Sequence, residues 1–176
     1  MAGLNLLITG RPGVGKTTLV TDVAERLRGS LRLAGFTTAE VRDASGQRTG
    51  FQILTVEGKQ AELARAGFRS SVQVGRYGVN LGAFERLALP ELARRDVDLI
   101  VIDEIGKMEC ASQRFCRAVE NALDAQASVL ATLGVARLRF LESVRSRPDV
   151  ELLGLTERNR NALVAELCSR FHGSPH

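Results

Sequence analysis

The chain of 176 residues is expected to adopt an α/β fold, in which a mainly parallel sheet is flanked by helices and carries an inserted antiparallel β-hairpin. Short apolar runs alternate along the chain with segments whose apolar residues recur at helical spacing. This alternation is typical of a parallel sheet with helices on both faces. Between residues 36 and 65, strand-like runs are separated only by turn residues, which predicts an antiparallel hairpin or meander.

The same patterns predict the individual elements. Strands are expected over residues 4–9, 36–42, 49–56, 60–65, 97–103, 128–133 and 150–155. Helices are expected over residues 17–28, from 81 onward, over 90–95, from 112 onward, over 137–144 and over 157–171. Asn80 and Ser112 are expected N-caps, because their side-chain oxygens can accept hydrogen bonds from the first turn. Pro90 is expected to start a new short helix, since proline suits a first turn but not a helix interior, and residues 75–79 are expected to be a loop.

The segment Gly10–Thr17 has the pattern G-x-x-x-x-G-K-T and lies between the first expected strand and the first expected helix. In this context backbone N–H groups can surround a phosphate, and the helix N-terminus adds partial positive charge. Lys16 can reach the β- and γ-phosphates, and the Thr17 hydroxyl can bind Mg²⁺. We therefore expect a nucleoside triphosphate as ligand, with contacts from Gly10, Arg11, Pro12, Gly13, Val14, Gly15, Lys16, Thr17 and Thr18.

A second apolar run ends in two adjacent carboxylates, Asp103 and Glu104. Ligands of open α/β sheets bind at the carboxyl ends of the strands, so these carboxylates are expected beside the phosphate loop. We assign Asp103 to Mg²⁺ through a bound water, and Glu104 to the orientation or deprotonation of an attacking water. A glutamate next to the metal aspartate favours hydrolysis. It is also typical of phosphate-loop proteins with an extra strand between the loop strand and the aspartate strand.

Composition argues against several other classes of protein. Hydrophobic residues make up 44% and charged residues 25%, as in globular domains, and no apolar run approaches the roughly 20 residues of a membrane span. The net charge of +4 comes without a long basic run and with only 5% aromatic residues, which argues against a nucleic-acid ligand. The three cysteines have no metal-ligand spacing and indicate reduced thiols in a cytoplasmic protein, with no signal peptide expected. We expect one domain over residues 1–171 and a polar tail over 172–176.

Further motifs are spread over residues 4–162 and together resemble a known family. They are GRPGVGKTT at 10–18, G-F-T-T at 35–38, E-V-R at 40–42, R-T-G-F at 48–51, V-G-R-Y-G-V at 74–79, I-D-E-I-G-K-M-E at 102–109 and T-E-R-N-R at 156–160. A phosphate loop alone is shared by many families, but this combination is far more specific. It resembles the small nucleoside-triphosphatase family first described from thermophiles, which includes the cancer-related nucleoside-triphosphatase.

The resemblance implies a RecA-like P-loop NTPase core. It also implies slow, Mg²⁺-dependent hydrolysis of the γ-phosphate from ATP, GTP and other nucleoside triphosphates. Matching positions imply further nucleotide contacts at Gly106 and, on the base, at Asn159. Residues 134–140 depart from the family pattern, so no role is carried over to them. The resemblance names no physiological substrate, and the protein partner stays open.

Hydrolysis requires positive charge on the transition state beyond that of Lys16 and Mg²⁺. Where an arginine finger exists, it contributes on the order of 10³–10⁵ in rate. The candidates for this transition-state cation are Lys107, Arg42, Arg48 and Arg76, of which Lys107 follows the carboxylate pair most closely. Tyr77 and Phe140 are candidates for stacking on the base.

Two alternative functions fit the same motifs. A nucleoside or nucleotide kinase also has a phosphate loop in an α/β fold, and its lid would draw on Arg137, Arg139, Arg145 and Arg147. A kinase must exclude water, however, whereas Glu104 suits its activation. A nucleotide-dependent switch would instead use the hairpin to report loss of the γ-phosphate to a partner. Hydrolysis is the leading hypothesis.

Overall fold

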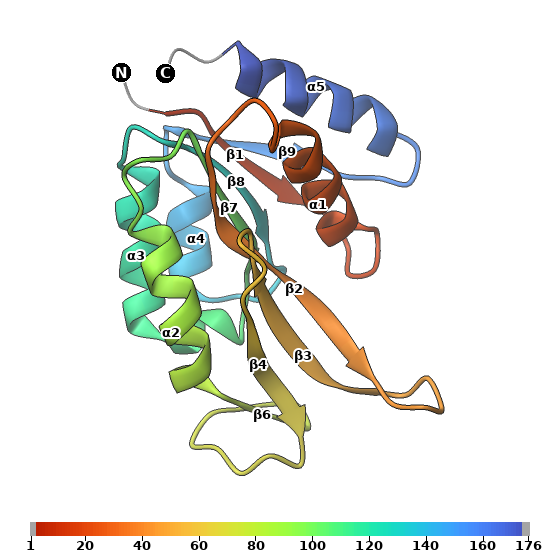
Figure 1. Cartoon of the computed structure of the whole chain (residues 1–176). Helices are drawn as coiled ribbons and strands as arrows, with labels where there is room; N and C mark the ends of the chain where they lie inside the picture. The colour runs from red at the N-terminus through yellow and green to blue at the C-terminus, as the bar shows by residue number, and fades with distance from the viewer. Residues whose placement is uncertain (1–2, 174–176) are drawn as a thin grey trace.

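The computed structural model describes residues 3–173, which form one nine-stranded sheet with helices on both faces (Figure 1). The strands are β1 Asn5–Thr9, β2 Leu33–Arg42, β3 Arg48–Thr55, β4 Gln60–Ala66, β5 Gln73–Val74, β6 Tyr77–Val79, β7 Leu99–Ile105, β8 Ser128–Leu133 and β9 Val150–Gly154. The helices are α1 Lys16–Leu27, α2 Leu81–Leu92, α3 Gln113–Leu123, α4 Arg139–Arg145 and α5 Arg160–His172, with a 3₁₀ turn η1 at Glu109–Ala111.

The parallel part of the sheet is formed by β2, β7, β8, β1 and β9, in that order. β7 and β8 are almost fully buried, as expected of central strands covered on both faces. β8 lies between β1 and β7, so the expected extra strand separates the loop strand from the aspartate strand. The carboxyl ends of these three strands therefore meet at one edge of the sheet.

The antiparallel part grows out of β2. Its first residues, Leu33 to Phe36, pair in parallel with β7, and the segment from Phe36 onward pairs with β3. The sheet continues through β4, as expected, and then through the short strands β6 and β5. The expectation of a loop over residues 75–79 is therefore wrong for 77–79. Tyr77 and Val79 are buried there and pair with β4, a tertiary contact that the glycine-rich local sequence does not reveal.

Two hydrophobic cores cover the faces of the sheet. α2, α3 and α4 pack on one face, where the rings of Phe36, Phe84 and Phe115 meet with centroids 5.1–6.1 Å apart. α1 and α5 pack on the other face over β1, β7 and β8. Asn80 and Ser112 cap α2 and α3 as predicted, since each side chain accepts a hydrogen bond from the N–H three residues later.

Pro90 does not start a second helix: it lies inside α2, which runs unbroken to Leu92. Proline removes one backbone hydrogen bond from a helix, but here only two residues before the last residue of the helix. The last turn is also fixed by packing. Ala88 and Leu92 are buried, and the Glu91 carboxylate accepts a hydrogen bond of 3.0 Å from the backbone N–H of Gly35.

Three boundaries near the C-terminus differ from expectation. α4 begins at Arg139, and α5 begins at Arg160 because Asn159 is engaged by the preceding loop. His172, expected in the tail, is the last residue of α5, and residues 174–176 lie outside the described part of the chain. Within residues 3–173, no helix combines the length and the apolar character needed to cross a membrane.

Candidate active site at the ends of β1, β7 and β8

The phosphate loop connects the buried strand β1 to α1. Gly15, at the N-cap of α1, has a φ of 101°, a left-handed conformation that favours glycine. No side chain of the described residues caps this helix, so its first N–H groups remain open to an anion. The Lys16 ammonium lies back across the loop and donates to the carbonyls of Gly10 at 2.9 Å and Arg11 at 3.3 Å.

Arg160 supports the loop from behind, a role that the sequence did not suggest. Its Nη2 donates a hydrogen bond of 2.7 Å to the carbonyl of Val14. A Cβ atom at Gly15 would lie 2.4 Å from the same nitrogen, so the guanidinium occupies the space that any side chain at 15 would need. The only signal for Arg160 in the sequence was its place in the T-E-R-N-R motif.

Asp103, on β7, is 1% exposed and lies beneath the loop. Its Oδ1 accepts a hydrogen bond of 2.7 Å from the Thr132 hydroxyl on β8, and the Thr17 and Thr38 hydroxyls also face the carboxylate. Burial raises the pKa of Asp103, and these hydrogen bonds oppose the shift. The sequence did not identify Thr132 or Thr38, because both reach Asp103 only through the order of the strands.

Glu104 projects toward the phosphate loop. Burial raises its pKa, the negative charge of Asp103 raises it further, and the positive charge of Lys16 lowers it. The peptide bond between Asp103 and Glu104 is cis. A carboxyl group with a raised pKa is a stronger base than a solvated one, provided that it is ionised at the working pH.

A cavity of about 520 Å³ lies between the loop and the β2–β3 hairpin. The loop wall is formed by Pro12, Gly13, Gly15, Lys16 and Thr17. The hairpin wall is formed by Thr38, Ala39, Glu40, Arg48 and Phe51. Glu104 lies at the cavity together with Gly134 and Val135, which follow β8. The structure thus brings most of the expected loop residues to Glu104, and it adds residues 134–135, to which the sequence assigned no role.

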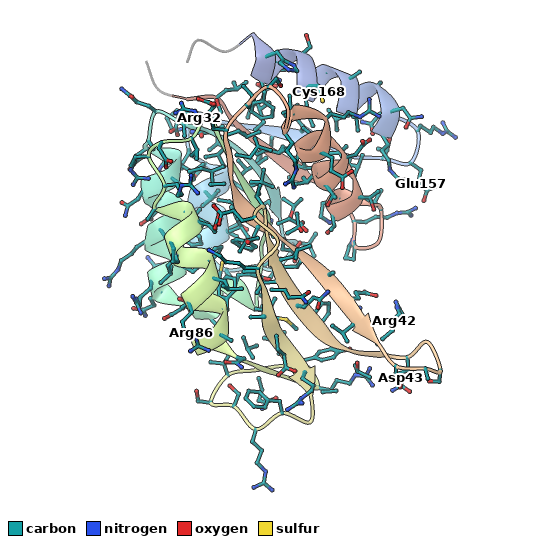
Figure 2. All side chains as sticks on the ribbon, viewed as in Figure 1. Arg32, Arg42, Asp43, Arg86, Glu157 and Cys168 are labelled. Carbon is teal, nitrogen blue, oxygen red and sulfur yellow. The ribbon has the colours of Figure 1, made fainter. Side chains whose placement is uncertain are left out.

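Of the four candidate transition-state cations, only Arg48 lines this cavity. Its guanidinium donates to Glu40 at 2.8 Å and to the Tyr77 hydroxyl at 2.9 Å. Arg42 lies near the hairpin tip (Figure 2), where it contacts Glu40 and the carbonyl of Gly46. The Arg76 guanidinium contacts the backbone carbonyl of Arg48, and Lys107 is exposed outside the cavity.

The remaining expected nucleotide contacts lie outside the cavity lining. Gly10 and the buried Val14 belong to the inner side of the loop, Gly106 is buried behind Glu104, and Thr18 is exposed on α1. Arg11 points outward and pairs with Glu157 of the β9–α5 loop, which Figure 2 shows projecting into solvent.

Two residues expected near the base are engaged by the protein itself. Asn159 accepts a hydrogen bond from the N–H of Thr156 and donates one to the carbonyl of Gly154, both at 2.8 Å. Tyr77 is buried, and its ring packs edge-on against Phe51. Among residues 3–173, Phe51 lines the cavity, and neither Tyr77 nor Phe140 does.

The oxygen donors of Thr17 and Asp103 fit a magnesium ion. Within residues 3–173, no group of three or more His, Cys, Asp or Glu side chains is arranged to hold a metal. Mg²⁺ is bound in nucleotide sites by one or two protein ligands, with phosphate and water completing its shell. A hydroxyl at the start of α1 and a buried carboxylate facing it supply such a partial set.

The fold and the site define a P-loop protein of the α/β class. Residues 5–168 match the family described as NTPase. The chain is 42% identical to nucleoside-triphosphatase THEP1 of Thermotoga sp. (strain RQ2), over 94% of each chain. It is 39% identical to the human cancer-related nucleoside-triphosphatase, over 97% of each chain. The crystal structure of THEP1 from Aquifex aeolicus superposes with a TM-score of 0.84 at 40% identity, covering 96% of this chain and 99% of that one. The chain belongs to the nucleoside-triphosphatase family.

Proposed function

We propose that the chain is a Mg²⁺-dependent nucleoside-triphosphatase that hydrolyses ATP, GTP and related nucleotides to diphosphate and phosphate. One observation carries this proposal: Lys16 and Thr17 of the phosphate loop line the same cavity as Glu104, with Asp103 buried beside them. The names of the relatives, which are nucleoside-triphosphatases, agree with it.

The residues of the chain divide the chemistry between them. The N–H groups at the start of α1 and the Lys16 ammonium bind the phosphates, and Thr17 and Asp103 would hold Mg²⁺, Asp103 through a water. When bound, the ion neutralises charge on the β- and γ-phosphate oxygens. Glu104 accepts a proton from water as the water oxygen attacks the γ-phosphorus. The bond from this phosphorus to the bridging oxygen breaks, and the diphosphate leaves.

Two further features of the cavity support slow turnover and a broad range of bases. Arg48 is held by Glu40 and Tyr77, so a phosphate must compete with both for its guanidinium. A cation that is only partly available contributes less than the full effect of an arginine finger. Phe51 lines the cavity with an apolar ring, over which the Arg48 guanidinium lies 5.2 Å from the ring centroid, and such a surface has no hydrogen-bonding groups to discriminate among bases.

The kinase alternative has less support. Its expected lid arginines do not line the cavity. Arg145 contacts Glu142 and the carbonyl of Gly134, and Arg147 pairs with Asp124 and Asp149. Arg137 and Arg139 border a separate surface depression next to α4. A switch function remains compatible with the site, because the hairpin forms one wall of the cavity.

The test is phosphate release by the purified chain with Mg²⁺ and each common nucleoside triphosphate, with and without added nucleosides and monophosphates. We expect release from several triphosphates without an acceptor. Lys16→Ala should abolish nucleotide binding and turnover together, whereas Glu104→Gln should keep Mg²⁺-nucleotide binding and lose hydrolysis. Glu166→Gln, at an exposed glutamate on α5, is the matched control.

Two outcomes would contradict the proposal. Normal hydrolysis by Glu104→Gln would show that another group activates the water. Transfer of phosphate to an added acceptor, with none released in its absence, would make the chain a kinase.

A further inference from the structure

A second glutamate lies buried behind the one assigned to catalysis. Glu109 is the first residue of η1 and is 5% exposed. Within residues 3–173, no lysine or arginine forms an ion pair with it. The backbone N–H groups of Gly106 and of Glu109 itself face its carboxyl group. A buried carboxyl group without a cationic partner is costly to ionise, and such groups occur preferentially at functional sites.

The carboxyl groups of Glu104 and Glu109 converge on Gly106. A Cβ atom at Gly106 would lie 2.6 Å from Oε1 of Glu104 and 2.9 Å from Oε2 of Glu109. The two oxygens thus occupy the same small space above one α-carbon. Gly134 closes the other side, since a Cβ there would lie 3.2 Å from the Gly106 α-carbon and 3.7 Å from Oε1 of Glu104. The Glu104 carboxyl therefore sits in a slot between two glycines, with Glu109 behind it and the cavity in front.

Two carboxyl groups that approach the same glycine, one of them buried away from water, do not both ionise readily, because their charges repel. Burial, and after it the charge of Glu104, raise the pKa of Glu109 to about 8, and the charge of Asp103 adds to the shift. At neutral pH Glu109 is therefore mainly a neutral acid, with one O–H group to donate. Glu104, which faces Lys16, is the better placed of the two to carry the negative charge.

We propose that Glu109 is a positioning residue for Glu104. As a neutral carboxylic acid it donates a hydrogen bond across Gly106 to the Glu104 carboxylate and keeps that carboxylate turned toward the cavity. The inference rests on the proposed role of Glu104 as the base. Glu109 does not touch the substrate; its effect is on the orientation of the group that does.

The experiment compares Glu109→Gln with Glu109→Met. The amide of glutamine can still donate a hydrogen bond to Glu104 and cannot ionise, so we expect kcat within about threefold of the wild type. Methionine has a similar volume and no donor, so kcat should fall by about 10–100-fold, by analogy with the loss of a hydrogen-bond partner that orients a metal ligand. KM and the dissociation constant of Mg²⁺-nucleotide should stay within about twofold in both variants, because neither touches the phosphate loop.

Glu91→Met is the matched control. Glu91 is also a buried glutamate, 6% exposed, that accepts a backbone hydrogen bond, but it lies on α2 outside the cavity. We expect this variant to lose stability and to keep its kcat per folded molecule. If the role of Glu109 were purely structural, Glu109→Met would likewise lose stability and keep its kcat per folded molecule.

Three outcomes would overturn the inference. The first is a wild-type kcat in Glu109→Met. The second is a kcat in Glu109→Gln as low as that of Glu109→Met. If Glu109→Met does not fold, an infrared difference spectrum between the wild type and Glu109→Gln at pH 7 still decides. We expect the wild type to show the band of a protonated carboxyl group and Glu109→Gln to lack it. The third outcome that would overturn the inference is a wild-type spectrum without this band. Hydrolysis by Glu104→Gln is measured in parallel. Its loss would support the proposed function even if the Glu109 variants show that Glu109 has no role.

Discussion

The Thr132 hydroxyl donates a hydrogen bond of 2.7 Å to Oδ1 of Asp103 and thereby joins the carboxyl ends of β8 and β7 beneath the phosphate loop. Thr132 is fully buried, so its hydroxyl has no water to bond instead. A hydrogen bond to an ionised carboxylate favours the charged form, which is the form that binds a cation. The extra strand of this fold therefore contributes directly to the expected metal site.

Thr132→Val removes this hydroxyl without changing the volume of the side chain. The pKa of Asp103, already raised by burial, should rise further, and the carboxylate should bind Mg²⁺ less well. We expect the Mg²⁺ concentration for half-maximal phosphate release to rise about tenfold, which corresponds to roughly 1.4 kcal/mol and lies near the lower end of the range for a hydrogen bond to a charged group. Thr132→Ser keeps the hydroxyl and should restore the wild-type response. An unchanged Mg²⁺ response in Thr132→Val would mean that Asp103 does not act through this bond.

Arg48→Ala tests which cation assists hydrolysis. Arg48 is the candidate that lines the cavity, so its loss should lower kcat by about 10²-fold, less than a full arginine finger because Glu40 and Tyr77 already share its charge. Arg42→Ala, at the hairpin tip, should change kcat by less than about threefold. Single-turnover phosphate release under saturating nucleotide measures both. Equal losses in the two variants would point to a general effect of hairpin charge.

Arg160→Ala removes the hydrogen bond to the Val14 carbonyl behind the phosphate loop. The loop should become less ordered, so the dissociation constant for Mg²⁺-nucleotide should rise about 5–10-fold, in line with the 1–1.5 kcal/mol of one hydrogen bond. Arg158→Ala, at an exposed arginine two residues earlier, is the control. Binding of a fluorescent nucleotide analogue gives both constants. If both variants bind normally, the loop keeps its shape without Arg160.

The pKa of Glu109 also predicts how stability depends on pH. Burial and the charges of Glu104 and Asp103, both on β7, raise this pKa from an ordinary 4.5 in the unfolded chain to about 8. The folded state then holds a proton that the unfolded state releases. The contribution of Glu109 to the free energy of unfolding is therefore fully present below about pH 4.5. It is lost as the pH rises toward 8, by up to about 1.4 kcal/mol per pH unit.

Urea unfolding between about pH 5 and pH 8 measures this loss. The wild type should lose stability relative to Glu109→Gln across that range, because glutamine at position 109 has no proton to release. Parallel stability curves for the two proteins would show that Glu109 ionises normally in the fold.

Features that depend on a short stretch of sequence were predictable, whereas contacts between distant residues were not. The phosphate loop, the Asp103–Glu104 pair and the alternation of strands and helices could all be predicted, because each depends on a short pattern with its own physical cause. A run such as β7 is apolar because it is buried on both faces, and a loop such as Gly10–Thr17 carries glycines because its backbone must curl. The sequence also predicted the antiparallel hairpin, because the strand-like runs between residues 36 and 65 are separated only by turn residues.

Only the tertiary structure decided which distant residues complete the site. Thr132 reaches Asp103 because β8 lies next to β7, Arg160 reaches Val14 because α5 packs beside α1, and the Glu109 carboxyl meets Gly106 through a turn of the chain. α2 likewise passes through Pro90, where sequence predicts a break, because packing holds its last turn. The physical reason is common to all of these. Hydrogen bonds and close packing between residues far apart in sequence depend on strand order and helix placement, which no local pattern encodes.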